Sequence, residues 1–288
     1  MREGERAVQP KRHDVAAHWD PGPDMAGPIY AMLNTSGVDA IDELGEKLKH
    51  IAEIDHFHGG SDETTEILRL MMNIPPSYDL HGLDVGCGVG GPMRWFAHKT
   101  GAKMEGVDIT SDFVAIANGI SNRLGMQGAC TAQEGDATNL PYPGASFDFA
   151  TMMAVSPNVI DRPKLYQSIE RVIKPGGIIG MLDLTQGAGG PPIFPAPWSI
   201  DGSPKTSLLL THEDTVAEAG KAGLTLSDTR NITPEVLRWF QKEQKELKVG
   251  RRVGREQYLG RYQEMVDNQI RNLSEDRVRF ECLVFRKQ

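Results

Sequence analysis

A glycine-rich segment, Leu83–Gly91, constrains the fold of this chain more than any other feature. A short apolar run leads into it, and a helix is predicted to begin near Pro92. Glycines between a strand and a helix let backbone N–H groups approach a ligand, and the helix N-terminus adds positive potential. The spacing of Gly86, Gly88 and Gly91 also fits the dinucleotide pattern G-x-G-x-x-G. The segment therefore predicts a nucleotide-type ligand without specifying which one.

Strand and helix signals alternate through the middle of the chain. Apolar runs predict strands, and apolar residues at helical spacing predict the helices between them. The expected strands are residues 80–85, 103–107, 129–133, 147–155, 178–184, 224–226 and 279–285. The expected helices are residues 92–99, 112–124, 161–173 and 211–222, with a further helix beginning at 233. This order predicts an α/β fold: a doubly wound, mostly parallel sheet of seven strands with helices on both faces.

The N-terminal quarter has a different character. Residues 1–24 are charged and contain proline and glycine, which predicts a loosely docked leader. Apolar residues at helical spacing predict a helix over 38–54, and a second is expected over 61–72 with Ser61 as its N-cap. We therefore divide the chain into residues 1–75, a leader and helical cap over the site, and residues 76–288, the ligand-binding domain. Substrate-side insertions are expected near 185–210 and 231–275.

Composition excludes several classes of protein. The chain has 31 Lys and Arg against 39 Asp and Glu, a net charge of −8, so no basic surplus is present to bind nucleic acid. No run approaches the roughly 18 apolar residues of a membrane span, and the first residues lack the apolar core of a secretory signal. Three cysteines, Cys87, Cys130 and Cys282, are too far apart for a metal motif or a disulfide framework. We expect a cytoplasmic protein with no metal, membrane or nucleic-acid partner.

Two acidic residues follow the next two predicted strands. Asp108 ends the second strand, where a carboxylate can accept hydrogen bonds from both ribose hydroxyls. Asp136 and Ala137 follow the third strand, in a place suited to an adenine amino group. Each acid alone is more often a helix cap or a turn residue. At three successive strand ends, however, they predict one nucleoside lying across the edge of the sheet.

With these motifs the chain resembles class I S-adenosylmethionine-dependent methyltransferases, over about residues 56–230. The Lys-Pro-Gly-Gly turn after the helix over 161–173 and the pair Asp136-Ala137 fit this family better than they fit an NAD-dependent oxidoreductase. The resemblance rests on Asp84-Val85-Gly86-Cys87-Gly88-Val89-Gly90, Asp108, Glu134-Gly135-Asp136-Ala137, Ser146-Phe147-Asp148 and Arg171-Val172-Ile173-Lys174-Pro175-Gly176-Gly177.

The resemblance implies S-adenosylmethionine as the cofactor and assigns residues to its parts. The glycine segment would approach the amino-acid portion, and later strand ends would hold the nucleoside and lie beside the sulfonium. The implied cofactor-binding residues are Asp84 near the ammonium group, Gly86, Gly88 and Gly90 at the amino-acid portion, Asp108 at the ribose, Ile109 on the adenine, Asp136 and Ala137 at its amino edge, and Met153 beside the sulfonium.

Within this family the chain looks most like sarcosine/dimethylglycine N-methyltransferases and sugar O-methyltransferases. The segment His56-Phe57-His58-Gly59-Gly60 precedes the first strand, as does a His-Gly segment over the cofactor in those enzymes. His56 and His58 are therefore candidate bases, since histidine titrates near neutral pH, although either can be a structural hydrogen bonder. Asp183 matches the position of a catalytic acid in the sugar O-methyltransferases, and a buried structural carboxyl is the alternative.

Four further residues are candidates for substrate binding. Ser156 and Asn158 follow the fourth strand, where many relatives carry a histidine base, and could bind substrate by hydrogen bonds. Phe194 and Trp198 lie in a Pro-rich segment and could line a pocket, although such aromatics more often pack on the core. Tyr258 and Tyr262 share a helical face and are interpreted as packing residues. Arg251, Arg252 and Arg255 are either a solvated turn or a grip for an anionic acceptor.

The sequence thus predicts methyl transfer from S-adenosylmethionine to an N or O atom of a small molecule. C-methylation of an isoprenoid or aromatic carbon is the alternative, and it would need an apolar pocket and a carboxylate that stabilises cationic charge. A non-catalytic S-adenosylmethionine-binding partner subunit is an alternative of another class, because no single catalytic residue stands out. A homodimer is possible in each case.

Overall fold

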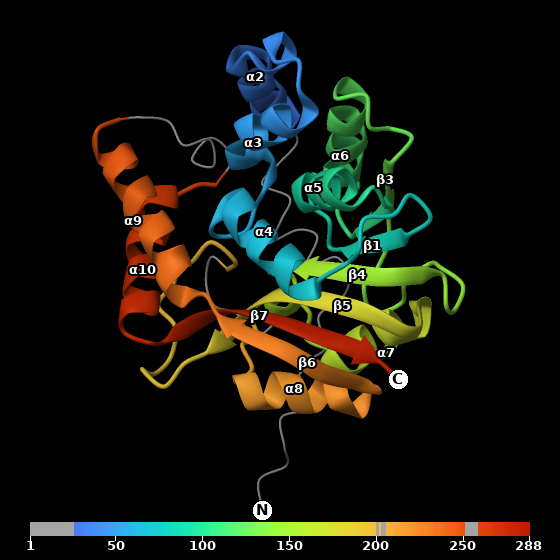
Figure 1. The fold of residues 1–288 in the computed structure, drawn as a ribbon. Helices are drawn as coiled ribbons and strands as arrows, with labels where there is room; N and C mark the ends of the chain where they lie inside the picture. Colours follow the sequence, from blue (N-terminus) through green and yellow to red (C-terminus); the bar gives the residue numbers. More distant parts are fainter. Residues whose placement is uncertain (1–25, 200–201, 203–205, 251–258) are drawn as a thin grey trace, which may run out of the picture.

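The computed structural model describes residues 26–199, 202, 206–250 and 259–288. A seven-stranded sheet forms its centre (Figure 1). The strands are β1 (His81–Val85), β2 (Lys103–Asp108), β3 (Cys130–Glu134), β4 (Phe147–Met153), β5 (Ile173–Gln186), β6 (Leu224–Asn231) and β7 (Val278–Lys287). The predicted doubly wound α/β class is confirmed.

The strand order is β3-β2-β1-β4-β5-β7-β6. The pairs from β3 to β5 are parallel, and β7 alone among the described strands runs antiparallel, to both β5 and β6. The strand order changes direction at β1, because β2 and β3 are added on one side of it and β4 and β5 on the other. Ligands of open α/β sheets bind outside the carboxyl ends of the strands at such a point.

Helices cover both faces of the sheet (Figure 1). On one face lie α4 (Ser61–Met72), α5 (Gly91–Thr100) and α6 (Ser111–Arg123), and on the other lie α7 (Arg162–Val172) and α8 (His212–Lys221). Side chains of a strand alternate between the two faces of the sheet. Each face therefore has its own hydrophobic core. Leu83 and Val85 pack in the core on α7 and α8, while Leu182 and Leu184 of β5 pack in the core on α4 and α5.

The remaining helices stand outside this layered unit. At the N-terminal end are α2 (Ala26–Ser36), η1 (Val38–Ala40) and α3 (Leu44–Asp55). Before β7 the chain forms α9 (Thr233–Lys248) and α10 (Tyr262–Ser274), which pack against each other and on β7. A further short turn, η2 (Ser156–Asn158), follows β4. Among the described helices, none combines the length and apolar character needed to cross a bilayer.

Several element boundaries differ from the sequence prediction. The single helix expected over 38–54 is instead η1 and α3, because Glu43 adopts an extended conformation and caps α3 by accepting from the N–H groups of Gly45 and Glu46. Ser61 is not the N-cap of α4; Gly60, with φ of 90°, occupies that position. The predicted leader, residues 1–24, lies outside the described residues.

Candidate active site

The glycine-rich segment forms a tight turn between β1 and α5. Gly86, Gly88 and Gly90 all have positive φ, at 70°, 51° and 83°. The N–H groups of Gly86 and Cys87 donate to the Val107 carbonyl at 2.7 and 3.0 Å, which pins the turn to β2. A Cβ on Gly86 would lie 2.4 Å from the Val155 side chain, so a larger residue cannot occupy this position without displacing the neighbouring loop.

Asp108, the last residue of β2, joins this turn to the next helix. Its Oδ2 accepts from the Gly88 N–H at 2.8 Å, and its Oδ1 accepts from the Thr110 N–H at 3.0 Å. Burial raises the pKa of this carboxyl although those hydrogen bonds lower it. Asp108 also lines the main cavity, so its remaining lone pairs face the place where the sequence predicts a ribose.

Asp84 lies beneath the turn rather than on the cavity. It occupies the penultimate position of β1 and is 1% exposed. Its Oδ1 accepts from the Thr151 hydroxyl at 2.8 Å, and burial raises its pKa to about 7. It does not line the cavity. Its assignment to the ammonium group of the cofactor therefore stays a prediction.

The other predicted nucleoside contacts come together at one end of the cavity. Ile109, Asp136, Ala137 and Met153 all line it, together with Gly86 and Gly88, whereas Gly90 does not. Asp136 accepts from the backbone N–H and the hydroxyl of Thr138, both at 2.8 Å, which fixes its side chain in the loop after β3. The structure thus places residues from the ends of β1, β2, β3 and β4 on one cavity, and their contacts with a cofactor stay predictions.

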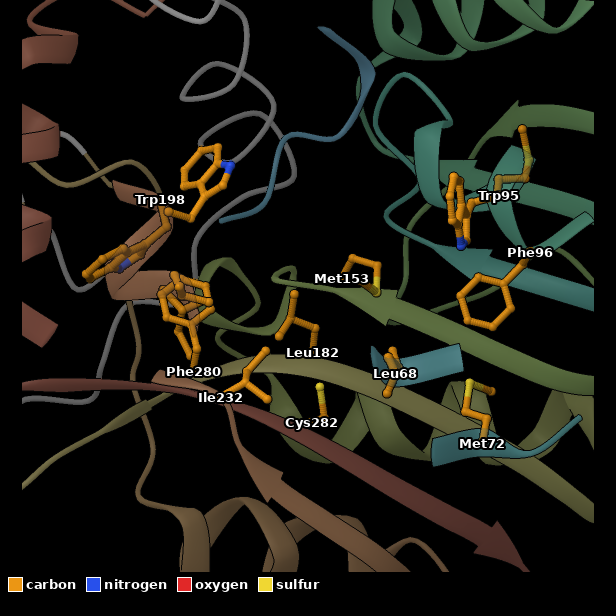
Figure 2. Packing of buried hydrophobic residues seen from close by; sticks show 14 of the residues in the cluster. Leu68, Met72, Trp95, Phe96, Met153, Leu182, Trp198, Ile232, Phe280 and Cys282 are labelled. Carbon is orange, nitrogen blue, oxygen red and sulfur yellow. The ribbon is translucent and has the colours of Figure 1, made fainter. Parts of the chain in front are cut away.

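The cavity, of about 300 Å³, continues from this end to an aromatic wall. Figure 2 shows Met153 at the end of β4, with Trp198 and Phe280 on one side of it and Trp95 and Phe96 on the other. Trp198 and Phe280 line the cavity, whereas Trp95 and Phe96 belong to the core beneath α5. Trp239, Phe240 and Tyr262 of α9 and α10 also line the cavity. Phe57 and Phe113, with ring centroids 5.4 Å apart, line it beside Gly88 instead.

The two candidate histidines lie in different surroundings. His56 is 1% exposed and does not line the cavity; its Nδ1 is 2.7 Å from Oδ1 of Asp55, which also bonds Arg94. His58 lines the cavity. Its Nδ1 is 3.2 Å from the Thr64 hydroxyl and its Nε2 is 3.0 Å from the Thr65 hydroxyl. Of this pair, the structure brings only His58 to the site.

Asp183 is buried away from the cavity. We expected it at the end of its strand, but β5 continues to Gln186, so strand alternation places Asp183 on the face of α7 while the cavity-lining Leu184 lies on the other face. Asp183 accepts from the Ser156 hydroxyl, and Nη1 of Arg162 is 4.0 Å away. Burial raises its pKa. These contacts correspond to the structural alternative for Asp183.

Two of the four candidate substrate residues line the cavity and two do not. Asn158 and Trp198 line the cavity, and the Asn158 amide donates to the carbonyls of Trp198 and Thr206 at 2.9 and 2.7 Å. Ser156 is fully buried beside Asp183, and Phe194 packs against Trp198 with ring centroids 5.8 Å apart, without lining the cavity.

Sequence reasoning placed residues 231–275 on the substrate side but did not single out the residues of α9 and α10 that line the cavity. Trp239, Phe240, Tyr262 and Gln269 line the cavity, and Tyr262, interpreted as packing, donates from its hydroxyl to Oε2 of the buried Glu243 at 2.5 Å. The sequence did contain a pattern that could have indicated this: Tyr262 and Gln269 are seven residues apart and therefore share one face of a helix. Tyr258 and the arginines at 251, 252 and 255 lie outside the described residues.

Part of the chain that contains this site is similar to known methyltransferases. The family described as a methyltransferase domain matches residues 83–181, which include the glycine turn and the ends of β1 to β4. Residues 83–181 of the chain form a methyltransferase domain. The chain is 36% identical over 101 residues to sterol 24-C-methyltransferase ERG6B of Gibberella zeae, covering 35% of this chain and 27% of that protein.

Two other likenesses extend over more of the chain. Erythromycin 3''-O-methyltransferase of Saccharopolyspora erythraea is 28% identical over 179 residues, covering 57% of this chain and 58% of that protein. The match thus spans less than two thirds of the length of either relative. The structure of geranyl diphosphate C-methyltransferase from Streptomyces coelicolor superimposes with a TM-score of 0.72 at 17% identity, covering 99% of this chain and 100% of that chain. This last likeness shows the fold.

The site of this methyltransferase domain fits the nucleoside cofactor of its class. The carboxylate of Asp108 is fixed by two backbone N–H groups and lies on the cavity, and the turn at Gly86 leaves no room for a side chain. No group of three or more His, Cys, Asp or Glu side chains that could hold a metal occurs among the residues the structure describes.

Proposed function

We propose that the chain transfers a methyl group from S-adenosylmethionine to an N or O atom of a small molecule with an apolar body. One observation carries the proposal: a single cavity joins the glycine turn and Asp108 at one end to the aromatic wall formed by Trp198, Trp239 and Phe280 at the other. The first end has the donors and carboxylates that suit a nucleoside. The second end has the apolar surface that suits an acceptor.

The chain's own residues would bind, align and shield the reactants. S-adenosylmethionine supplies an electrophilic methyl group on a sulfonium. Asp108 would hold the ribose, the glycine turn would let the amino-acid portion approach its backbone closely, and Met153, at the end of β4 on the cavity, would lie beside the sulfonium. Methyl transfer is an in-line displacement, so much of the rate enhancement comes from alignment and exclusion of water. The aromatic wall provides both.

An N or O nucleophile that carries a proton also needs a base. His58 is the candidate that lines the cavity, and the threonine hydroxyls of Thr64 and Thr65 fix the orientation of its ring. An unprotonated ring nitrogen of His58 would accept the proton released by the acceptor.

C-methylation is the second candidate, and a specific observation favours it. The cavity is bounded by several aromatic rings, and the hydroxyl of one of them, Tyr262, donates to the carboxylate of Glu243, which is buried behind it and does not line the cavity. Aromatic faces stabilise the cation that forms when a carbon attacks the methyl group. The relative from Gibberella zeae is also named as a C-methyltransferase, of sterols.

The test is calorimetric titration with S-adenosylmethionine, S-adenosylhomocysteine and NAD. We expect micromolar binding of both adenosyl ligands to the wild-type protein and no binding of NAD. Asp108→Ala should weaken the adenosyl ligands by about tenfold or more, since hydrogen bonds to a charged group contribute about 1.5–3 kcal/mol. Asp112→Ala is the matched control, because Asp112 is exposed in the next helix. Binding of NAD in place of the adenosyl ligands would overturn the proposal.

Turnover then separates the remaining alternatives. Incubation with S-adenosylmethionine carrying a ¹³C-methyl group and a panel of phenols, aromatic amines and isoprenoid alcohols should give a methyl carbon with the NMR shift of an N- or O-methyl group. A C-methyl shift would select the second candidate. Cofactor binding without turnover on any acceptor would instead favour the non-catalytic partner subunit. The expected homodimer and cytoplasmic location stay predictions.

A further inference from the structure

A buried glutamine on α10 lies on the acceptor end of the cavity. The side chain of Gln269 is 0% exposed, and it lines the cavity two helical turns from Tyr262. Neither its Nε2 nor its Oε1 has a hydrogen-bond partner among the described residues. A buried amide left without partners costs free energy, so its presence calls for an explanation.

Neighbouring amides on the same helix make the contrast clear. The Asn268 amide donates to the Pro195 carbonyl at 3.0 Å, and the Asn272 amide both donates to the carbonyl of Ile193 and accepts from its N–H, at 3.0 and 2.8 Å. These two residues fasten α10 to the segment after β5. Gln269 makes no such bond within the described part of the chain and faces the cavity, so packing of α10 does not account for it.

The walls around Gln269 restrict what could satisfy it. Tyr262, Trp239, Trp198 and Phe280 line the same end of the cavity, and aromatic rings favour a flat apolar partner. A primary amide presents one N–H donor beside one carbonyl acceptor. The group that complements it presents an acceptor beside a donor in the same plane.

We propose that Gln269 recognises the methyl acceptor, and that the acceptor is a flat, largely apolar ring whose edge carries a hydrogen-bond donor next to an acceptor, as in a lactam. This inference rests on the proposed function and names the substrate class of the same site. Two-point pairing with the buried amide fixes the ring against the aromatic wall. Because a site built for hydrogen bonding rejects analogues that lack the group, Gln269 sets specificity.

Two isosteric probes test the pairing. Quinolin-2(1H)-one carries the lactam N–H and carbonyl, whereas coumarin replaces that N–H by a ring oxygen without adding bulk. Both are titrated calorimetrically into the protein saturated with S-adenosylhomocysteine. We expect the wild-type protein to bind the lactam about tenfold or more tightly than coumarin, because coumarin leaves a buried carbonyl unpaired. Gln269→Leu should remove that preference.

Matched variants separate recognition from folding. Gln263→Leu is the control, since Gln263 lies on α10 away from the cavity and bonds Asp267, and it should keep the preference. The melting temperature of Gln269→Leu should be unchanged or higher by about 2–4 °C, because the variant removes unpaired buried atoms. A residue with a structural role would instead lower it.

The outcomes distinguish this inference from the proposed function. Equal affinity for the two probes, no binding of the lactam, or an unaltered preference in Gln269→Leu would overturn the role of Gln269. Binding of S-adenosylhomocysteine, measured first in the same samples, tests the proposed function independently. A protein that binds S-adenosylhomocysteine and does not discriminate between the probes keeps the proposed function and loses this inference.

Discussion

Asp84 is a single buried carboxyl, beneath the glycine turn, that lowers the stability of the folded protein. The residue is 1% exposed, and its Oδ2 has no hydrogen-bond partner among the described residues. Burial raises the pKa of this carboxyl from 3.8 to about 7, although the Thr151 hydroxyl lowers it. The folded protein therefore retains a proton that the unfolded chain loses. Between these two values, stability falls as pH rises.

Replacing Asp84 by Asn should stabilise the unliganded protein at pH 8. A rise of the pKa from 3.8 to about 7 corresponds to at most about 4 kcal/mol, which the wild-type protein loses once the pH exceeds both values. At pH 4 the folded carboxyl is protonated and the unfolded one is only partly ionised, so the remaining penalty is below about 1 kcal/mol and the variant and the wild type should be similar. Thermal unfolding at pH 4 and pH 8 measures the difference. Asp79→Asn, at an exposed position before β1, should show no such pH dependence.

Individual residues also show what a sequence can predict about a site. Asp108 and Asp136 were predicted because parallel strands bring their carboxyl ends to one edge, and both line the cavity. Asp183 was predicted from the resemblance to sugar O-methyltransferases, at the end of a strand expected over 178–184, but β5 continues two residues further, to Gln186. A carboxyl within a strand takes the face that alternation assigns to it, and here that face is the one covered by α7.

At the scale of elements, the turn between β1 and α5 depends on what surrounds it. Gly86 has φ of 70°, and a Cβ there would lie 2.4 Å from Val155. Gly125 has a similar φ of 72° but no atom within 4 Å of its Cβ position. Both glycines therefore adopt a left-handed backbone conformation, but only at Gly86 would a Cβ collide with a neighbouring side chain.

This pair gives a matched experiment on the glycine turn. Gly125→Ala should cost about 1–2 kcal/mol for the left-handed backbone and leave cofactor binding unchanged. Gly86→Ala has the same backbone cost and must also displace the Val155 side chain beside the cavity, so we expect binding of S-adenosylhomocysteine to weaken by about tenfold or more. Calorimetry on both variants measures this difference. Similar affinities in the two variants would show that the close approach at Gly86 does not matter for binding.

Elements were predicted best where local pattern and tertiary packing agree. The strands of the parallel sheet and the helix capped by Asp161 follow from apolar periodicity and local hydrogen bonding, and α7 begins as predicted, with Asp161 accepting from the Lys164 N–H. Trp198 was a predicted pocket residue, but the residues of α9 and α10 in the aromatic wall were not predicted, because these helices have ordinary amphipathic patterns. Whether the buried face of such a helix packs on core or on a cavity depends on the space opposite it, which periodicity does not encode.

At the scale of the whole molecule, a buried ion pair fastens the N-terminal helices to the domain. Arg94 of α5 is 0% exposed; its Nη2 donates to Oδ2 of Asp55 in α3 at 2.9 Å and to the Val89 carbonyl at 2.7 Å. Its Nη1 donates to the Ala117 carbonyl of α6 at 3.1 Å. One guanidinium thus connects the N-terminal cap, the glycine turn and the helix after β2, so the geometry of the site depends on the cap being in place.

Replacing Asp55 by Asn should therefore destabilise the protein strongly at neutral pH. Burial alone would raise the pKa of Asp55, but His56 and Arg94 outweigh it and lower the pKa. The lowered pKa contributes stability above the unfolded value, and this is lost as pH falls through the folded value. Removing one partner leaves Arg94 buried and uncompensated, which costs about 3–5 kcal/mol. Urea unfolding at pH 7 measures the loss.

The surface pair between Asp39 and Arg123 provides the control. The Asp39 side chain is 67% exposed, so solvent screens this pair and Asp39→Asn should cost far less stability than Asp55→Asn. The double variant Asp55→Leu, Arg94→Met removes both buried charges and should recover a large part of the loss, because the penalty arises from the unpaired charge. If Asp55→Asn cost no more than Asp39→Asn, the apolar contacts that Leu48 and Ile51 of α3 make with the domain would hold the cap, and the guanidinium would not couple it to the glycine turn.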